Sequence, residues 1–131
     1  MDVIDRYIEE MNQDTMFDDF SLKDTQMKLP SIKHKWVGRL IRHKDTISKL
    51  TAKKKSLISN ISKKLVDEGD YKISQPMAEK ACEKHETVIN ISKQIKGEYL
   101  IVEFLEKCEK VLNSMTFDIK NLVEIMKMET L

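Results

Sequence analysis

Residues 31–68 read SIKHKWVGRLIRHKDTISKLTAKKKSLISNISKKLVDE, and this stretch decides the fold. It contains no proline and a single glycine, Gly38. Its seam residues recur at alternating steps of four and three, which is the heptad pattern of a helix that packs along another helix. The seam consists of Trp36, Leu40, His43, Ile47, Leu50, Lys54, Leu57 and Ile61. The stretch therefore predicts one helix, about 57 Å long at 1.5 Å per residue.

A second heptad pattern follows after a turn. Gly69 is expected to end the first helix, and Pro76 to stand in the first turn of the next, where its missing N–H costs nothing. Residues 77–112 and 116–128 are predicted to be helical, either as one helix or with a break between them. The repeating apolar residues are Met77, Ala81, Val88, Ile91, Ile95, Val102, Leu105, Leu112, Met115, Ile119, Leu122 and Met126. Two long helices joined by a short turn predict an antiparallel helical hairpin.

An acidic segment precedes the long helix. Residues 1–13 carry apolar side chains spaced as on one face of a short amphipathic helix, which is too short to be stable without a docking surface. Residues 14–30 lack a period and are interpreted as a linker that Pro30 closes. We therefore expect an all-α protein with two parts, an acidic N-terminal helix and linker over residues 1–30 and a helical functional domain over residues 31–131.

Charge is sharply segregated along the chain, although the net charge is only +1. Residues 1–24 carry eight acidic and two basic residues, whereas residues 28–64 carry twelve basic residues and one acidic residue. Residues 65–131 carry nine basic and thirteen acidic residues. A concentration of positive charge such as that of residues 28–64 attracts polyanions. The alternative is a solvated basic helix face that has no partner.

The basic residues of the long helix gather on one side of it. At 100° per residue, most of them lie within a sector of roughly 80° beside the apolar seam. The sector holds Lys35, Arg39, Arg42, Lys49, Lys53 and Lys64, while Lys54 and Lys55 widen the stripe and Lys63 marks its end. Such a stripe suits a phosphate backbone, because each neutralised phosphate releases counterions. A membrane surface would require an apolar face where this helix has a heptad seam, so nucleic acid is favoured over lipid.

Aromatic side chains that could stack on bases are scarce near this stripe. Only Trp36 and Tyr71 are candidates, and Trp36 is expected to be a core residue because it belongs to the seam. Recognition of nucleic acid is therefore predicted to be electrostatic, sensitive to salt and independent of base sequence.

No catalytic, metal or cofactor site is predicted. Cys82 and His85 share a helical face but lack the further ligands that a zinc site needs. His34 and His43 have no acidic partner at helical spacing apart from Asp45, so a catalytic dyad is not indicated. The three glycines are too far apart to form a phosphate-binding loop. We therefore expect that the protein is not an enzyme.

The composition indicates a cytoplasmic protein. No stretch is apolar enough for a transmembrane helix, and the acidic N-terminus lacks the apolar core of a signal peptide. Cys82 and Cys108 are predicted to lie on one helix, about 39 Å apart at 1.5 Å per residue, which is too far for a disulfide. Unpaired cysteines fit a reducing compartment.

Four stretches in a specific order carry a family resemblance. Residues 29–36 (LPSIKHKW) resemble the start of a long basic helix, and residues 51–55 (TAKKK) resemble a lysine-rich stretch within it. Residues 67–71 (DEGDY) resemble an acidic turn with a glycine, and residues 117–121 (FDIKN) resemble a Phe-x-Ile-Lys signature. From about residue 20 onward, the chain thus resembles the UvsY family, the recombination mediator proteins of T-even-like bacteriophages.

The resemblance implies a role without catalysis or cofactor. Proteins of this family bind single-stranded DNA, the phage recombinase and the phage single-strand-binding protein, and help the recombinase to load onto covered strands in the cytoplasm of the infected bacterial host. The resemblance also implies a closed homo-oligomeric ring of about six or seven subunits, to which the C-terminal region contributes. The residues expected there are Val102, Leu105, Leu112, Met115, Phe117, Ile119, Leu122 and Met126.

The resemblance also points to DNA contacts within residues 31–131. The family has a basic-x-basic-Leu pattern at the end of its long helix, and residues 61–65 (ISKKL) match one of the two basic positions in register. The expected DNA contacts are Lys63 and Lys64 first, then Lys53, Lys54 and Lys55, together with Lys35, Arg39, Arg42 and Lys49 of the stripe. The acidic N-terminal segment is expected either to contact proteins or to fold back on the stripe and compete with DNA. A structural coiled-coil adaptor without a nucleic-acid role is the alternative function.

Overall fold

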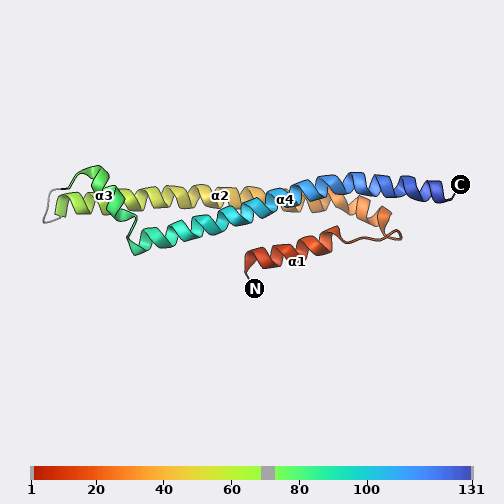
Figure 1. The fold of residues 1–131 in the computed structure, drawn as a ribbon, viewed down its shortest axis with the longest axis horizontal. Coiled ribbons are helices and arrows are strands. Elements are labelled where there is room, and N and C mark those ends of the chain that lie inside the picture. Colours follow the sequence, from red (N-terminus) through yellow and green to blue (C-terminus); the bar gives the residue numbers. More distant parts are fainter. Residues whose placement is uncertain (1, 69–72, 131) are drawn as a thin grey trace. The chain divides into compact units, whose positions relative to one another are not determined.

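The computed structural model describes residues 2–68 and 73–130, which form four helices and no strand. In chain order these are α1 (Val3–Thr15), α2 (Leu22–Glu68), α3 (Gln75–Cys82) and α4 (Glu86–Glu129). The all-α prediction is confirmed. The chain forms two compact units, Met1–Arg42 with Ile101–Leu131 as the first and His43–Leu100 as the second. Within each unit, a part of α2 runs antiparallel to a part of α4, as the hairpin prediction required (Figure 1). Within these residues, no helix combines the length and apolarity that a membrane crossing needs.

The predicted short N-terminal helix is confirmed as α1. Asp2 caps it, because its carboxylate accepts a hydrogen bond from Asp5 N–H at 2.9 Å. Met11 is buried and Val3, Ile4 and Tyr7 are half-buried, so one face of α1 docks on the rest of the first unit.

α2 begins at Leu22, so the predicted linker covers only residues 16–21 rather than 14–30, and the predicted helix start at residue 31 is wrong. Pro30 lies inside the helix, where it lacks the N–H that would donate to the carbonyl of Gln26. The helix continues because Leu22 and Leu29 extend the seam from Trp36 in steps of seven, and both are buried. Burial of two leucines contributes on the order of 3–6 kcal/mol, which offsets a cost of about 3 kcal/mol for an interior proline.

The observed burial agrees with the rest of the predicted α2 seam. Trp36, Leu40 and Ile47 are buried. The other predicted seam residues are half-buried, namely His43, Leu50, Lys54, Leu57 and Ile61. In the first unit, Lys33 Nζ also donates a hydrogen bond to Thr116 Oγ1 at 3.0 Å, which joins α2 to α4.

The predicted continuous helix over residues 77–112 is wrong, because a turn at residues 83–85 separates α3 from α4. Each N–H of this turn donates to the carbonyl three residues earlier, at 3.3, 3.2 and 2.9 Å. His85 then starts α4, because its Nδ1 accepts a hydrogen bond from Thr87 N–H at 3.2 Å. Of the two alternatives for residues 113–116, the continuous helix is the one observed, since α4 runs through them.

The apolar face of α3 differs from the prediction by one residue. Ala78 and Cys82 are buried, whereas the predicted Met77 and Ala81 are exposed. The reason is that α3 packs on the end of α2 rather than continuing into α4. Gln75 Nε2 donates to Ser62 Oγ at 2.9 Å, and the Cys82 thiol donates to the carbonyl of Ile58 at 3.7 Å.

Both cysteines carry free and buried thiols. Cys82 lies on α3 and Cys108 on α4, so the prediction that one helix carries both is wrong. Gly69 and Tyr71, predicted to end the first helix and to offer a stacking ring, lie outside the described residues.

Candidate nucleic-acid interface

In the first unit, α1 covers basic residues of α2. Glu10 accepts hydrogen bonds from Nη1 and Nη2 of Arg39 at 2.5 and 3.1 Å, and from Lys35 Nζ at 3.0 Å. Asp14 accepts from Lys35 Nζ at 2.6 Å and from Trp36 Nε1 at 2.7 Å. Two predicted DNA contacts, Lys35 and Arg39, are therefore ion-paired within the chain. Lys35, Trp36 and Arg39 are named the covered site below.

Two aromatic rings enclose the guanidinium group of Arg39. Its central carbon lies 4.8 Å from the ring centroid of Tyr7 and 4.8 Å from that of Trp36. The two rings meet edge to face, with centroids 5.6 Å apart and planes at 80°. Contacts of a cation with an aromatic face contribute about 0.5–2 kcal/mol, depending on desolvation. Trp36 is only 1 % exposed, so its predicted place in the core is confirmed.

Ion pairing shifts the pKa values of Glu10 and Lys35 in the directions that favour their charged forms. The hydrogen bond from Arg39 lowers the pKa of Glu10 and outweighs the effect of partial burial, and Lys35 adds to it. Burial alone would lower the pKa of Lys35, but the hydrogen bonds to Asp14 and Glu10 together outweigh it and raise that pKa. Both groups are therefore charged at neutral pH. Because the two side chains remain 34 % and 36 % exposed, water and salt screen the Lys35–Glu10 pair.

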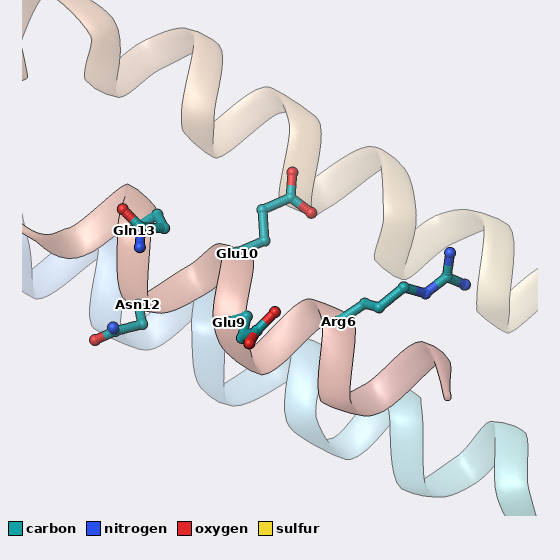
Figure 2. A pocket seen from close by; sticks show the side chains of 5 residues that line it. All are labelled: Arg6, Glu9, Glu10, Asn12 and Gln13. Atoms are coloured by element: carbon teal, nitrogen blue, oxygen red, sulfur yellow. The ribbon is translucent and has the colours of Figure 1, made fainter. Parts of the chain in front are cut away.

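The polar side chains of α1 do not all face α2. Figure 2 shows Glu10 extending toward α2, while Glu9 and Asn12 leave α1 in other directions. Together with Arg6 and Gln13, these side chains line an open hollow of about 480 Å³. The ion pairs described between this group and α2 involve Glu10. Glu9 therefore offers a reference position for Glu10 on the same helix.

In the second unit, lysines of α2 face solvent. Residues 43–64 contain seven lysines and a single acidic residue, Asp45. Lys49 pairs with Asp45 at 2.9 Å, and this hydrogen bond raises the pKa of Lys49. Lys54 is half-buried in the seam, and the other six lysines are exposed. Four of these six, named the open lysines, are Lys53, Lys55, Lys63 and Lys64.

At the end of α2, residues 61–65 include buried and exposed side chains next to one another. Ser62 is fully buried and bonds to Gln75 on α3, and Ile61 is half-buried. Lys63 and Lys64 are exposed beside them. The two lysines that the family pattern singles out are thus accessible to a ligand. Arg42, the remaining predicted contact, is exposed on the part of α2 in the first unit.

Most residues predicted to assemble an oligomer lie inside the first unit. The buried ones are Val102, Leu105, Leu112, Met115 and Ile119, and the half-buried ones are Leu122 and Met126. Phe117 is 66 % exposed. Two further apolar residues on the same part of α4, Val111 and Ile125, are about half exposed. They lie two heptads apart on one helix face, a signal that the seven-residue spacing could have revealed.

His43 and His85 have structural partners. His43 Nδ1 lies 2.6 Å from Glu98 Oε2 on α4, a partner that spacing within one helix could not reveal. His85 caps α4, so its proximity to Cys82 has a structural explanation. The part of the chain that the structure describes contains no group of three or more side chains that could hold a metal ion.

Comparison with known proteins gives structural and family matches. Crystal structures of the bacteriophage T4 recombination mediator protein UvsY share this fold at 16 % sequence identity. The lattice type IV structure gives a TM-score of 0.84 and covers 98 % of this chain and 99 % of that one. The lattice type II structure gives 0.81 over 99 % and 98 %, and the lattice type I structure gives 0.78 over 92 % and 96 %. No curated protein matches the chain.

At this identity, the structural likeness shows the fold alone. The family profile described as "Recombination, repair and ssDNA binding protein UvsY" matches residues 10–130, which is most of the chain. The protein therefore belongs to the UvsY family of recombination, repair and single-stranded-DNA-binding proteins.

Proposed function

We propose that this protein is a recombination mediator that binds single-stranded DNA through the open lysines of α2. The observation that carries the proposal is their exposure on a stretch of α2 with one acidic residue among seven lysines. At 100° per residue, Lys53 and Lys64 share one helix face, Lys63 lies about 80° from Lys53 around the helix, and Lys55 lies on the opposite side, about 160° away. Family membership supports single-stranded DNA as the polyanion.

The contact is mainly electrostatic. Each phosphate neutralised on a single strand adds about −0.7 to the slope of log K against log salt, so four open lysines predict a slope of about −3 per protomer. A weak single site gains strength when several protomers bind one strand, because the later contacts form at high effective concentration. A homo-oligomeric ring of about six or seven subunits would provide this gain.

In the same proposal, the DNA-bound protein helps a recombinase to load onto strands that a single-strand-binding protein covers, in the cytoplasm of the infected bacterium. Residues 31–131 provide DNA binding and assembly, and residues 1–30 form an acidic accessory segment. The protein would act by holding and presenting the strand, without catalysing a reaction.

The test compares a variant of the open lysines with a matched control. Fluorescence anisotropy would measure binding of a labelled oligonucleotide, single- and double-stranded, across a salt series. The variant reverses Lys53, Lys55, Lys63 and Lys64 to Glu. The control reverses four exposed lysines of α4 to Glu, namely Lys93, Lys96, Lys110 and Lys120. Both variants change the net charge equally, so a difference between them reports position rather than total charge.

We expect the α2 variant to lose single-strand affinity and most of the salt dependence, and the α4 control to retain most of both. Equal losses in both variants would mean that binding follows overall charge. No binding by the unaltered protein at low salt would leave the coiled-coil adaptor as the better function. Recombinase loading would be tested separately, by filament formation on strands covered by single-strand-binding protein.

A further inference from the structure

We propose that α1 is a releasable cover over a second contact for single-stranded DNA. This contact is the covered site, in which phosphates would replace the carboxylates of Glu10 and Asp14 and a base would replace the ring of Tyr7. The inference rests on the proposed function, since it names a further part of the same DNA-binding surface and its regulation.

The groups that α1 offers to the covered site resemble those of a nucleotide. Glu10 presents two oxygens to the two Nη atoms of Arg39, which is the fork geometry that a phosphate also satisfies. Asp14 gives a second anionic acceptor, bound by Lys35 Nζ and Trp36 Nε1. The two carboxylates of α1 thus bind cations that the phosphates of a DNA strand could bind instead.

The aromatic part of the contact points to a single strand. Tyr7 places its ring against both Trp36 and the guanidinium group of Arg39. An unpaired base offers an aromatic face for the same two partners, and such stacking is a common mode of single-strand binding. A duplex keeps its bases stacked inside, so it could satisfy only the anionic part. The covered site therefore favours single-stranded over double-stranded DNA.

The docking of α1 is weak enough to be reversed. α1 has 13 residues, a length at which an isolated helix is marginal in water, and Met11 is its one buried residue. The side chains that form these ion pairs are partly exposed. Those of Lys35, Arg39 and Glu10 are 23 to 36 % exposed, and that of Asp14 is 17 % exposed. The connection to α2 is also exposed, with Met16 64 % and Phe20 94 % accessible. A polyanion can therefore compete with α1 for the same cations.

Trp36 gives a direct readout, because it is the only tryptophan in the chain. We expect oligothymidylate to quench Trp36 fluorescence by stacking and to change its accessibility to acrylamide. Duplex DNA of the same length should quench Trp36 less, because it offers no unpaired base to stack on the indole. A Trp36 signal that stays constant at saturating oligothymidylate would overturn the proposal, because the cover would then remain in place during binding.

Two double variants test competition by the carboxylates. Glu10→Gln with Asp14→Asn removes both anions of the cover, and Glu9→Gln with Asp19→Asn removes two anions of the same segment that lie outside it. If α1 covers the site in nine of ten molecules, release tightens the apparent Kd for single strands about tenfold. We expect this gain in the first variant beyond any gain in the second. Adding Arg39→Gln to the first variant should abolish the gain.

The outcomes separate this inference from the proposed function. Equal gains in both double variants would reduce α1 to a general source of negative charge and overturn the inference. DNA binding that depends on the open lysines, with no Trp36 response, would also overturn it while leaving the proposed function in place. No DNA binding by any variant would overturn both proposals.

Discussion

The thiol of Cys108 is 3 % exposed, and burial raises its pKa to about 11. Burial also raises the pKa of Cys82, which is 1 % exposed. Since the thiolate is the reactive form, only about one Cys108 in a thousand is reactive at pH 8, before access is considered. We expect a thiol reagent at pH 8 to label Cys108 of the native protein at least about a hundredfold more slowly than in the urea-unfolded chain.

The variant Cys82→Ala assigns the remaining labelling to Cys108. Its native rate should stay slow and should rise only with urea. Rapid labelling of Cys108 under native conditions would mean that the first unit opens locally, since this side chain is buried there.

Trp36 shows what could be predicted at the scale of a residue. Its place in the heptad seam predicted a buried side chain, and its exposure of 1 % agrees. The hydrogen bond from its Nε1 to Asp14 could not be predicted, because the two residues come from different helices. The same limit hid the contact of His43 with Glu98, while the exposure of Lys63 and Lys64 followed from their places outside the seam.

At the scale of an element, Pro30 interrupts the hydrogen bonding of α2 while its own side chain is exposed. Pro30→Ala should restore the N–H donor to the Gln26 carbonyl and remove the steric conflict with it. We expect the free energy of unfolding to rise by about 1–3 kcal/mol, less than the full cost of an interior proline because the unfolded chain also gains freedom. Urea denaturation followed by circular dichroism would measure this.

Ser31→Ala is the matched control, because Ser31 is the next residue and is also exposed. It should change the stability by no more than about 0.5 kcal/mol. A loss of stability in Pro30→Ala would show that the fold needs the backbone restriction that the proline imposes.

The docking of α1 should depend on pH at both extremes. The pKa of Glu10 is lowered in the folded state, so its contribution is present above its ordinary value of 4.5 and is lost as pH falls through the lower folded value. The pKa of Lys35 is raised, so its contribution is present below 10.5 and is lost as pH rises through the higher folded value. We expect α1 to stay docked between about pH 5 and pH 10.

The emission maximum of Trp36 would follow this transition, moving to longer wavelength when α1 leaves and water reaches the indole. Glu10→Gln with Asp14→Asn should remove most of the acid transition. A shift between pH 6 and pH 8 would contradict the assignment, because neither Glu10 nor Lys35 changes charge in that range.

The helices also show why some elements could not be placed from the sequence. The seam and the absence of breakers predict most of α2 but not its first turns, because Pro30 is typical of a helix boundary and the burial of Leu22 and Leu29 depends on tertiary packing. The turn at residues 83–85 contains neither glycine nor proline, and the end of α2 determines the register of α3 through Ala78 and Cys82. Tertiary packing therefore determines both the start of α2 and the register of α3. The acidic N-terminal segment was expected either to contact proteins or to fold back on the basic stripe. In the structure, α1 folds back on Lys35 and Arg39 of this stripe.

At the scale of the whole molecule, assembly requires apolar surface that the fold leaves accessible. Most of the residues predicted for the oligomer are occupied inside the first unit, whereas Val111 and Ile125 expose about half of their area on one face of α4. Two heptads separate them, as in a helix that meets a neighbouring copy. We expect Val111→Glu with Ile125→Glu to dissociate the proposed ring while leaving the helical content of each protomer intact.

Dissociation should also weaken DNA binding, because protomers that no longer share one strand lose the effective concentration of linked sites. The apparent affinity for a long single strand should fall by about 100-fold or more. The control Gln94→Glu with Asn113→Glu adds the same charge at exposed positions of α4 that lie about 100° or more around the helix from Val111 and Ile125, and it should preserve both assembly and affinity. Sedimentation velocity across a dilution series and anisotropy with a long oligonucleotide would measure the two effects.

An intact oligomer in the Val111 and Ile125 variant would place the interface elsewhere, with exposed Phe117 as the next residue to change. Dissociation without loss of affinity would mean that one protomer binds the strand alone, so avidity would not be part of the mechanism.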